Sequence, residues 1–367
     1  MTNRRGFLRK TLGAYWTGAA LLEQSLFRAN QARAQAMPNS PSLFDIQKIA
    51  DHVYAAVAKP AAVLNCNAAI FETSQDLLVV DTHSKPSAVV ALVAQLKREV
   101  SPKPVRYVVN SHFHWDHTQG TPAYRKMNPP PHIIASEATR RLLSENGAER
   151  IKQSLDQMRS TLEFTEQQRA KTKDADALRK LTDLETGVRS YIAEMKDYIP
   201  ELPDLTFDHE LILHDKMQDL HIAFRGRAHT SGDVVVFSPQ SKVVATGDMI
   251  HSMLPFIGDA YPREWPVTMR SVAELPFDHL IGGHGPVQNG KSNLQGMAAY
   301  IEELTNAVAR DKDKPLSDLQ ASITPARLTS LSGDYGKFVT QNLGSPNALA
   351  AGIRTNIADI HKRLGAA

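Results

Sequence analysis

Short apolar runs separated by turn-forming residues mark the chain from residue 43 onward. β-branched and aromatic residues bounded by Asn, Ser, Gln and Asp predict short strands within 43–58 and 68–82, and 105–111 has the composition of a buried strand. Between them, Pro86 opens a predicted helix whose apolar face includes Val89, Val90, Leu92, Val93 and Leu96. This order of strand, helix and strand predicts an α/β fold, in which active sites lie at the carboxyl ends of strands.

A polar stretch with helical periodicity follows, from about 136 to 200. Thr165 and Gln168 have the spacing of a capping box that would restart a helix, and Pro200 and Pro203 would end the stretch. Its apolar positions recur at helical spacing: Leu178, Leu181, Leu184, Val188, Tyr191, Ile192 and Met195. We expect two inserted helices. They would serve as a solvated structural hairpin, a lid over a site, or an arm that joins a homo-oligomer.

The strand pattern resumes within 210–226, 233–248 and 279–285, and the residues SPQSK (238–242) predict a hairpin turn. After about residue 290 the pattern is again helical. We therefore expect a domain over 37–290, interrupted by the helical insert, and a helical C-terminal extension over 291–367.

The first 36 residues have a different character from the rest. The paired Arg4 and Arg5, a modest apolar stretch and the residues ARAQA (32–36) resemble a bacterial twin-arginine export signal that is cleaved after Ala36. These residues carry a net charge of +5, whereas the whole chain carries +3, so the remainder is close to neutral at −2. We expect a periplasmic protein without the basic surface of a nucleic-acid binder.

Other features of composition narrow the class of protein further. No apolar run reaches the roughly 20 residues that a membrane-spanning helix needs. Cys66 is the single cysteine, so an internal disulfide is excluded. The 42% hydrophobic and 22% charged residues among 367 are ordinary for a soluble globular protein. We expect its substrate to be a small molecule.

The segment NSHFHWDHTQG (110–120) carries the candidate chemistry. If His112 and His114 continue the strand, they share a face and converge on one metal ion. Asp116 and His117 would lie past the strand end and turn toward a second ion. A zinc site needs three or four protein ligands, so the cluster predicts further ligands at other strand ends.

Three downstream segments supply such residues. His229 in GRAHTSGD, Asp248 in ATGDMI and His284 in GGHGP each follow an apolar run and lie among glycines, which allow close approach of the backbone. Each segment alone is weak evidence, but their conjunction is specific. The other nine histidines, such as His132, His209, His214 and His361, lack this context and are interpreted as surface or core residues.

Together these segments resemble the metallo-β-lactamase superfamily of binuclear metallohydrolases over about 45–290. The resemblance implies a four-layer αββα sandwich with the metal ions at one edge. It implies that His112, His114 and His229 bind metal 1, that Asp116, His117 and His284 bind metal 2, and that Asp248 bridges both. It also implies that Asp81 supports the metal-binding loop from outside the ligand set. His83 stands where the family often has glycine.

The resemblance further implies a hydrolase. Two zinc ions, or iron or manganese in their place, would supply hydroxide for attack on the carbonyl of an ester, thioester, lactone or amide. Asp116 would orient the nucleophile or relay its proton. Asp248 matches glyoxalase II and many lactonases, whereas β-lactamases usually have Cys or Ser there. The segment 251–286 resembles exported hydrolases, including relatives associated with quinoproteins and sulfur oxidation.

Three alternatives remain open at the level of sequence. One is a β-lactamase, and another is a persulfide dioxygenase with one iron held by the metal 1 histidines and Asp248. The third is a periplasmic metal-binding or ligand-binding protein without catalysis. No Ser–His or Cys–His pair is evident, and Cys66 is distant in sequence from the motifs, so we expect no covalent intermediate.

Overall fold

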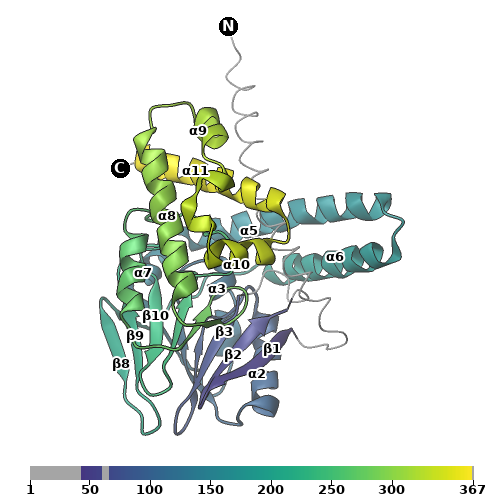
Figure 1. Cartoon of the computed structure of the whole chain (residues 1–367). Coiled ribbons are helices and arrows are strands. Elements are labelled where there is room, and N and C mark those ends of the chain that lie inside the picture. Colours follow the sequence, from purple (N-terminus) through teal and green to yellow (C-terminus); the bar gives the residue numbers. More distant parts are fainter. Residues whose placement is uncertain (1–42, 60–65, 366–367) are drawn as a thin grey trace.

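Two β-sheets pack face to face at the centre of the protein (Figure 1), and the computed structural model describes residues 43–59 and 66–365. The predicted export signal lies outside the described residues. The first sheet has the order β1-β2-β3-β4-β5-β6-β7: Phe44–Ala50, Val53–Ala58, Ala68–Glu72, Leu77–Val80, Val105–Val109, His132–Ser136 and Leu205–Phe207. The second has the order β13-β12-β11-β10-β9-β8: Gln288–Asn289, His279–Gly282, Val243–Gly247, Val234–Ser238, Leu220–Phe224 and Glu210–Leu213.

The strand directions place several carboxyl ends at one edge. Strands β4 to β7 pair in parallel, and so do β11 and β12, whereas the other pairs are antiparallel. The predicted hairpin at 238–242 is confirmed, because Val236 pairs with Ala245 across the β10–β11 turn. The residues that follow β5, β11 and β12 therefore lie near one another at this edge.

Helices cover the outer face of each sheet, which confirms the predicted four-layer αββα sandwich. On the first sheet, α2 (Pro86–Glu99) and α4 (Thr121–Arg125) bury Leu92 and Tyr124 against the strands. On the second sheet, α7 (Trp265–Ala273) and α8 (Ser292–Arg310) bury apolar side chains in the same cluster as Val235 and Val244. Alternate strand residues fill the space between the sheets, because successive side chains point to opposite faces.

The apolar face of α2 is narrower than the sequence predicts. Ala88, Val89, Leu92 and Leu96 are buried, but the side chain of Val90 is 60% exposed. Val90 lies about 100° around the helix from Val89, since one turn takes 3.6 residues. The inclusion of Val90 in the packed face was therefore wrong.

The C-terminal helices share the core of the second sheet. They are α8, α9 (Leu316–Ser322), α10 (Asp334–Leu343) and α11 (Pro346–Gly365). Tyr300, Val339 and Ile353 belong to the same buried cluster as the strands beneath them. Figure 1 shows α8 and α11 above the second sheet, whereas the insert projects to the right.

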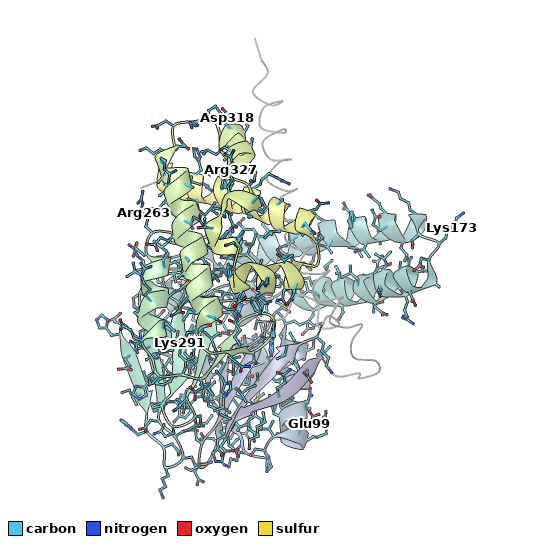
Figure 2. All side chains as sticks on the ribbon, viewed as in Figure 1. Glu99, Lys173, Arg263, Lys291, Asp318 and Arg327 are labelled. Atoms are coloured by element: carbon cyan, nitrogen blue, oxygen red, sulfur yellow. The ribbon has the colours of Figure 1, made fainter. Side chains whose placement is uncertain are left out.

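The insert is an arm of two helices, α5 (Glu137–Lys171) and α6 (Ala175–Met195), which extend together from the body (Figures 1 and 2, with Lys173 at the far end). Val188, Tyr191 and Met195 pack against α5 in a cluster that also contacts Trp115. Leu178, included in the predicted stripe, is 41% exposed. Across the described residues, no helix is both long and apolar enough to cross a membrane.

The predicted capping box at Thr165 was wrong. Helix α5 continues through this position, and the Thr165 hydroxyl donates to the Thr161 carbonyl within the same helix. The chain turns seven residues later, and Asp174 caps α6 by accepting a hydrogen bond from the Ala177 N–H. Thr165 is fully buried within the continuous helix, so the tertiary packing of the arm outweighs the local capping signal.

Candidate metal centre

The four motif segments meet at the edge where the strands end. His112 and His114 follow β5, His229 lies between β9 and β10, Asp248 follows β11, and His284 follows β12. The strand before the first cluster ends at Val109, so His112 and His114 converge from a bend rather than from one face of a strand. Asp116 and His117 lie on a short helix, α3 (Trp115–Thr118), rather than in a loop. Both local predictions were wrong, although the residues do come together.

One group of three histidines forms around the predicted metal 1 position. Ligand atoms of His112, His114 and His229 all lie within 4.8 Å of one another. Nδ1 of His114 is 2.9 Å from Nε2 of His229, which fixes the ring atoms that face the shared space. Three imidazole nitrogens in this arrangement match a zinc ligand set.

The second group forms around the predicted metal 2 position. Asp116, His117 and His284 also place their ligand atoms within 4.8 Å of one another. The Asp116 Oδ2 atom is 3.1 Å from His284 Nε2 and 3.4 Å from His117 Nε2. A carboxylate and two imidazoles are a second ligand set of the kind that zinc, iron or manganese accepts.

Asp248 lies between the two groups. Its Oδ1 atom is 3.3 Å from His117 Nε2 and 3.5 Å from His284 Nε2, while its Oδ2 atom is 3.6 Å from His229 Nε2. One oxygen therefore faces each group. The backbone of Gly283 lies so close to Asp248 Oδ1 that a side chain at 283 would have no space.

The buried polar atoms of the site fit divalent metal ions. His112 Nε2, His117 Nε2 and Asp248 Oδ1 are buried without a hydrogen-bond partner. Leaving a polar atom buried and unpaired costs about 1–3 kcal/mol, so three at one point indicate a site built for a ligand. The atoms are imidazole nitrogens and a carboxylate oxygen, which are zinc ligands.

The protonation of the histidines agrees with this reading. Burial lowers the pKa of His112 and of His229 well below that of free imidazole, and the neighbouring imidazoles add to the effect. Both rings are therefore neutral and keep a lone pair for a metal ion. Burial alone would also lower the pKa of His117, but the carboxylates of Asp248 and Asp116 hold it well above its usual range. The site thus concentrates negative charge that a cation would balance.

Hydrogen bonds orient the ligand rings from outside. Asp81 Oδ2 accepts from His117 Nδ1 at 2.8 Å, and Asp81 Oδ1 accepts from the Ser111 N–H at 2.7 Å. The far nitrogen of His112 lies 3.0 Å from Ser111 Oγ, and that of His229 lies 3.2 Å from the Phe256 carbonyl. Such contacts fix the tautomer and direction of each ligand. Asp81 thus lies where a supporting role requires it.

Asp81→Ala should weaken both the fold and the metal centre. The change leaves the Ser111 N–H and His117 Nδ1 buried without acceptors, at about 1–3 kcal/mol each, so the free energy of unfolding should fall by about 2–6 kcal/mol. Urea unfolding of the zinc-free protein measures this loss. The matched control is Asp51→Ala, because the Asp51 side chain is 86% exposed. Equal stability of the two variants would contradict the assigned contacts.

Sequence reasoning missed several residues that the fold brings to the site. His83 is fully buried, and its ring lies beside Cys66, whose Sγ is 3.6 Å from His83 Nδ1. His251 is also buried, and its ring centroid is 6.2 Å from those of His229 and His284. Both had been interpreted only as surface or core residues, and the structure shows them buried beside the site. Each had a signal in the sequence, because His83 lies two residues after Asp81 and His251 three residues after Asp248.

Cys66 is close to the site in space although distant in sequence. Its Sγ lies within 4.8 Å of ligand atoms of Asp81 and His117. Burial raises the pKa of this thiol to about 12, so it is protonated at neutral pH. A protonated thiol is a poor nucleophile, which agrees with the expectation of a mechanism without a covalent intermediate.

Comparison of the sequence with known proteins identifies a family. The sequence profile of the metallo-beta-lactamase superfamily matches residues 61–284. A metallo-beta-lactamase type 2 of Elizabethkingia meningoseptica is 27% identical over 109 residues, which are 27% of this chain and 44% of that protein. This chain therefore matches less than half the length of that relative.

The solved structure of one metallo-beta-lactamase supports the same fold. The DIM-1 metallo-beta-lactamase aligns with a TM-score of 0.51 and 17% identity, over 72% of this chain and 99% of its own. A metallo-beta-lactamase from Pontibacter korlensis aligns with a TM-score of 0.48 and 18% identity, over 70% of this chain and 95% of its own. Since the family profile covers more than half of the sequence, including all seven clustered residues, the chain belongs to the metallo-beta-lactamase superfamily.

Proposed function

We propose that this protein is a metal-dependent hydrolase that uses two zinc ions to cleave an ester, thioester, lactone or amide bond in a small molecule. The observation that supports it best is the pair of ligand groups joined by Asp248, with unpaired buried atoms in both groups. Two zinc ions bound there would supply hydroxide at neutral pH and polarise the scissile carbonyl.

The side chains divide the work as follows. His112, His114 and His229 would hold one ion and Asp116, His117 and His284 the other, and Asp248, whose oxygens face both groups, would serve both. Asp116 also orients the attacking nucleophile or accepts its proton, since its carboxylate lies beside the second group and remains 16% exposed.

An apolar wall lies beside the first group. Phe256 is 40% exposed, and its ring centroid is 5.7 Å from that of His114 and 5.9 Å from that of His229. An exposed aromatic ring next to polar catalytic groups is typical of a pocket for a small organic substrate. This supports a small molecule as the substrate class.

Metal analysis followed by a substrate panel tests the proposal. We expect two zinc ions per chain and turnover of at least one ester, thioester, lactone or amide. The panel includes β-lactams, because the relative described above is a β-lactamase. One iron per chain with oxidation of a persulfide would replace the proposal with a dioxygenase. A zinc-loaded protein that turns over no compound would be a binding protein.

Export to the periplasm by the twin-arginine pathway is also proposed, on the residues RRGFL and ARAQA. Changing Arg4 and Arg5 together to Lys should hold the protein in the cytoplasm, since Lys keeps the charge but not the paired arginines. Fractionation of cells followed by immunoblotting measures the distribution. Undiminished delivery of the double variant to the periplasm would refute the signal.

A further inference from the structure

Asp259 connects the metal 1 group to parts of the chain outside the sandwich. It lies in the loop between β11 and α7, and its Oδ2 accepts from Nε2 of His114 at 2.8 Å. His114 turns its other nitrogen, Nδ1, toward His229. Asp259 therefore fixes the direction of a proposed metal ligand through the nitrogen that faces away from the metal position.

The inserted helix α5 contacts this carboxylate directly. Arg150 Nη2 donates to Asp259 Oδ1 at 2.5 Å, and the side chains of both residues are largely buried. The guanidinium also stacks over the ring of Phe113, with its carbon 5.2 Å from the ring centroid. Phe113 lies between His112 and His114 in sequence. Arg150 thus contacts the segment that carries His112 and His114 directly at Phe113, and it reaches His114 through Asp259.

The last helix approaches Asp259 from another direction. Arg363, near the end of α11, donates to the Gly258 carbonyl at 2.5 Å, and its Nη2 lies 3.8 Å from Asp259 Oδ1. Two arginines from separate helical elements therefore converge on the Asp259 carboxylate.

We propose that Arg150 and Arg363 act through Asp259 as positioning residues for His114, so that the insert and the C-terminal helix set the affinity of one metal position. This inference rests on the proposed metal centre. It assigns the base of the arm a function distinct from that of a lid. The base of the arm, through Arg150, holds the segment around His114 in place. The far end of the arm is not needed for this role.

Zinc titration of the full chain against a chromophoric chelator tests the inference. Asp259→Asn keeps the shape of the side chain but removes its charge, and it should weaken one of two zinc equivalents by about 10–100-fold. Arg150→Met should weaken the same equivalent by a smaller factor. The double variant should lose no more than Asp259→Asn alone, because Met keeps an apolar contact with Phe113 and the lost guanidinium acts on His114 through Asp259. Arg363→Met removes the second arginine beside Asp259. It should lower the affinity for the same zinc equivalent.

The visible spectrum of the cobalt(II)-substituted protein gives a readout of ligand direction. Asp259→Asn and Arg150→Met should both shift the bands of the weakened equivalent. The control is Arg159→Met on the same helix, since Arg159 is 54% exposed and pairs only with Asp156 among the described salt bridges. It should leave affinity and spectrum unchanged. Circular dichroism of each zinc-free variant confirms that it is folded.

The outcomes separate this inference from the proposed function. A wild-type protein that binds two zinc ions, with unchanged affinities in Asp259→Asn and in both arginine variants, would overturn the positioning role alone. Losses that add in the double variant would show that Arg150 acts independently of Asp259 and would also overturn it. A wild-type protein that binds no zinc would refute the metal centre itself.

Discussion

Asp248→Ala is expected to abolish binding of both metal ions and to lower kcat/KM by about a thousandfold or more, because a bound metal ion supplies several kcal/mol of transition-state stabilisation. Its two oxygens face different ligand groups, at 3.3 Å from His117 and 3.6 Å from His229. No other described carboxylate lies within ion-pair distance of both of these histidines. Metal content after dialysis and steady-state kinetics measure the two losses.

The control for this variant is Asp278→Ala, since that side chain is 63% exposed and pairs with Lys242 at the surface. It should keep both metal ions and full activity. A protein that lacks Asp248 but still binds two ions and turns over at the wild-type rate would disprove the bridging assignment. Loss of a single ion would assign Asp248 to one position only.

Gly283→Ala should strongly lower the metal affinity of the same site without removing any candidate ligand. A Cβ atom at 283 would lie 1.9 Å from Asp248 Oδ1 and 3.0 Å from His117 Cε1 and from the Gly247 carbonyl carbon. These atoms belong to candidate ligands and to the backbone, so the strain cannot be relieved by a flexible side chain. We expect metal affinity to fall by at least about 100-fold, beyond the upper end of what loss of an outer hydrogen bond costs.

The comparison for this variant is Gly333→Ala. A Cβ at Gly333 would meet no atom within 4 Å, and its φ of −96° is open to any residue. That variant should bind zinc as the wild type does. If Gly283→Ala also binds zinc normally, then the ligand geometry around Asp248 and His117 differs from the one described. Crystallography of the zinc-loaded variant would show how.

The clustering of the candidate ligand residues was predictable from sequence, because each combines a reactive side chain with a local signature. His112 to His117 form a dense cluster, and His229, Asp248 and His284 each follow an apolar run and are flanked by glycine. The parallel strands β11 and β12 end at the same edge, and the packing of the two sheets brings the residues after β5 and in the β9–β10 connection to that edge as well. The backbone path was less predictable, because the bend at 112–114 and helix α3 depend on packing against α5.

The supporting residues had no such signature. Arg150 lies among other charged residues on α5, and Asp259 is one carboxylate in a loop. Their role depends on tertiary contacts of α5 and α11 with the loop between β11 and α7, and no local pattern in the sequence predicts these contacts. Thr165 shows the opposite failure, because a valid local capping pattern was overridden by packing between α5 and α6.

The distribution of the ligands over both sheets has a mechanical consequence. His112, His114, Asp116 and His117 follow a strand of the first sheet, whereas His229, Asp248 and His284 belong to loops of the second. Any ion shared between them is a cross-link between the halves of the sandwich. Zinc at 100 times its dissociation constant would add about 2.7 kcal/mol per site to the resistance against separation. Chelation of the metal ions should therefore loosen this edge of the sandwich first. The Val234 N–H donates a hydrogen bond to the Ser111 carbonyl and so links the two sheets at this edge. Amide hydrogen exchange at Ser111 and Val234 should therefore accelerate before exchange at the opposite edge.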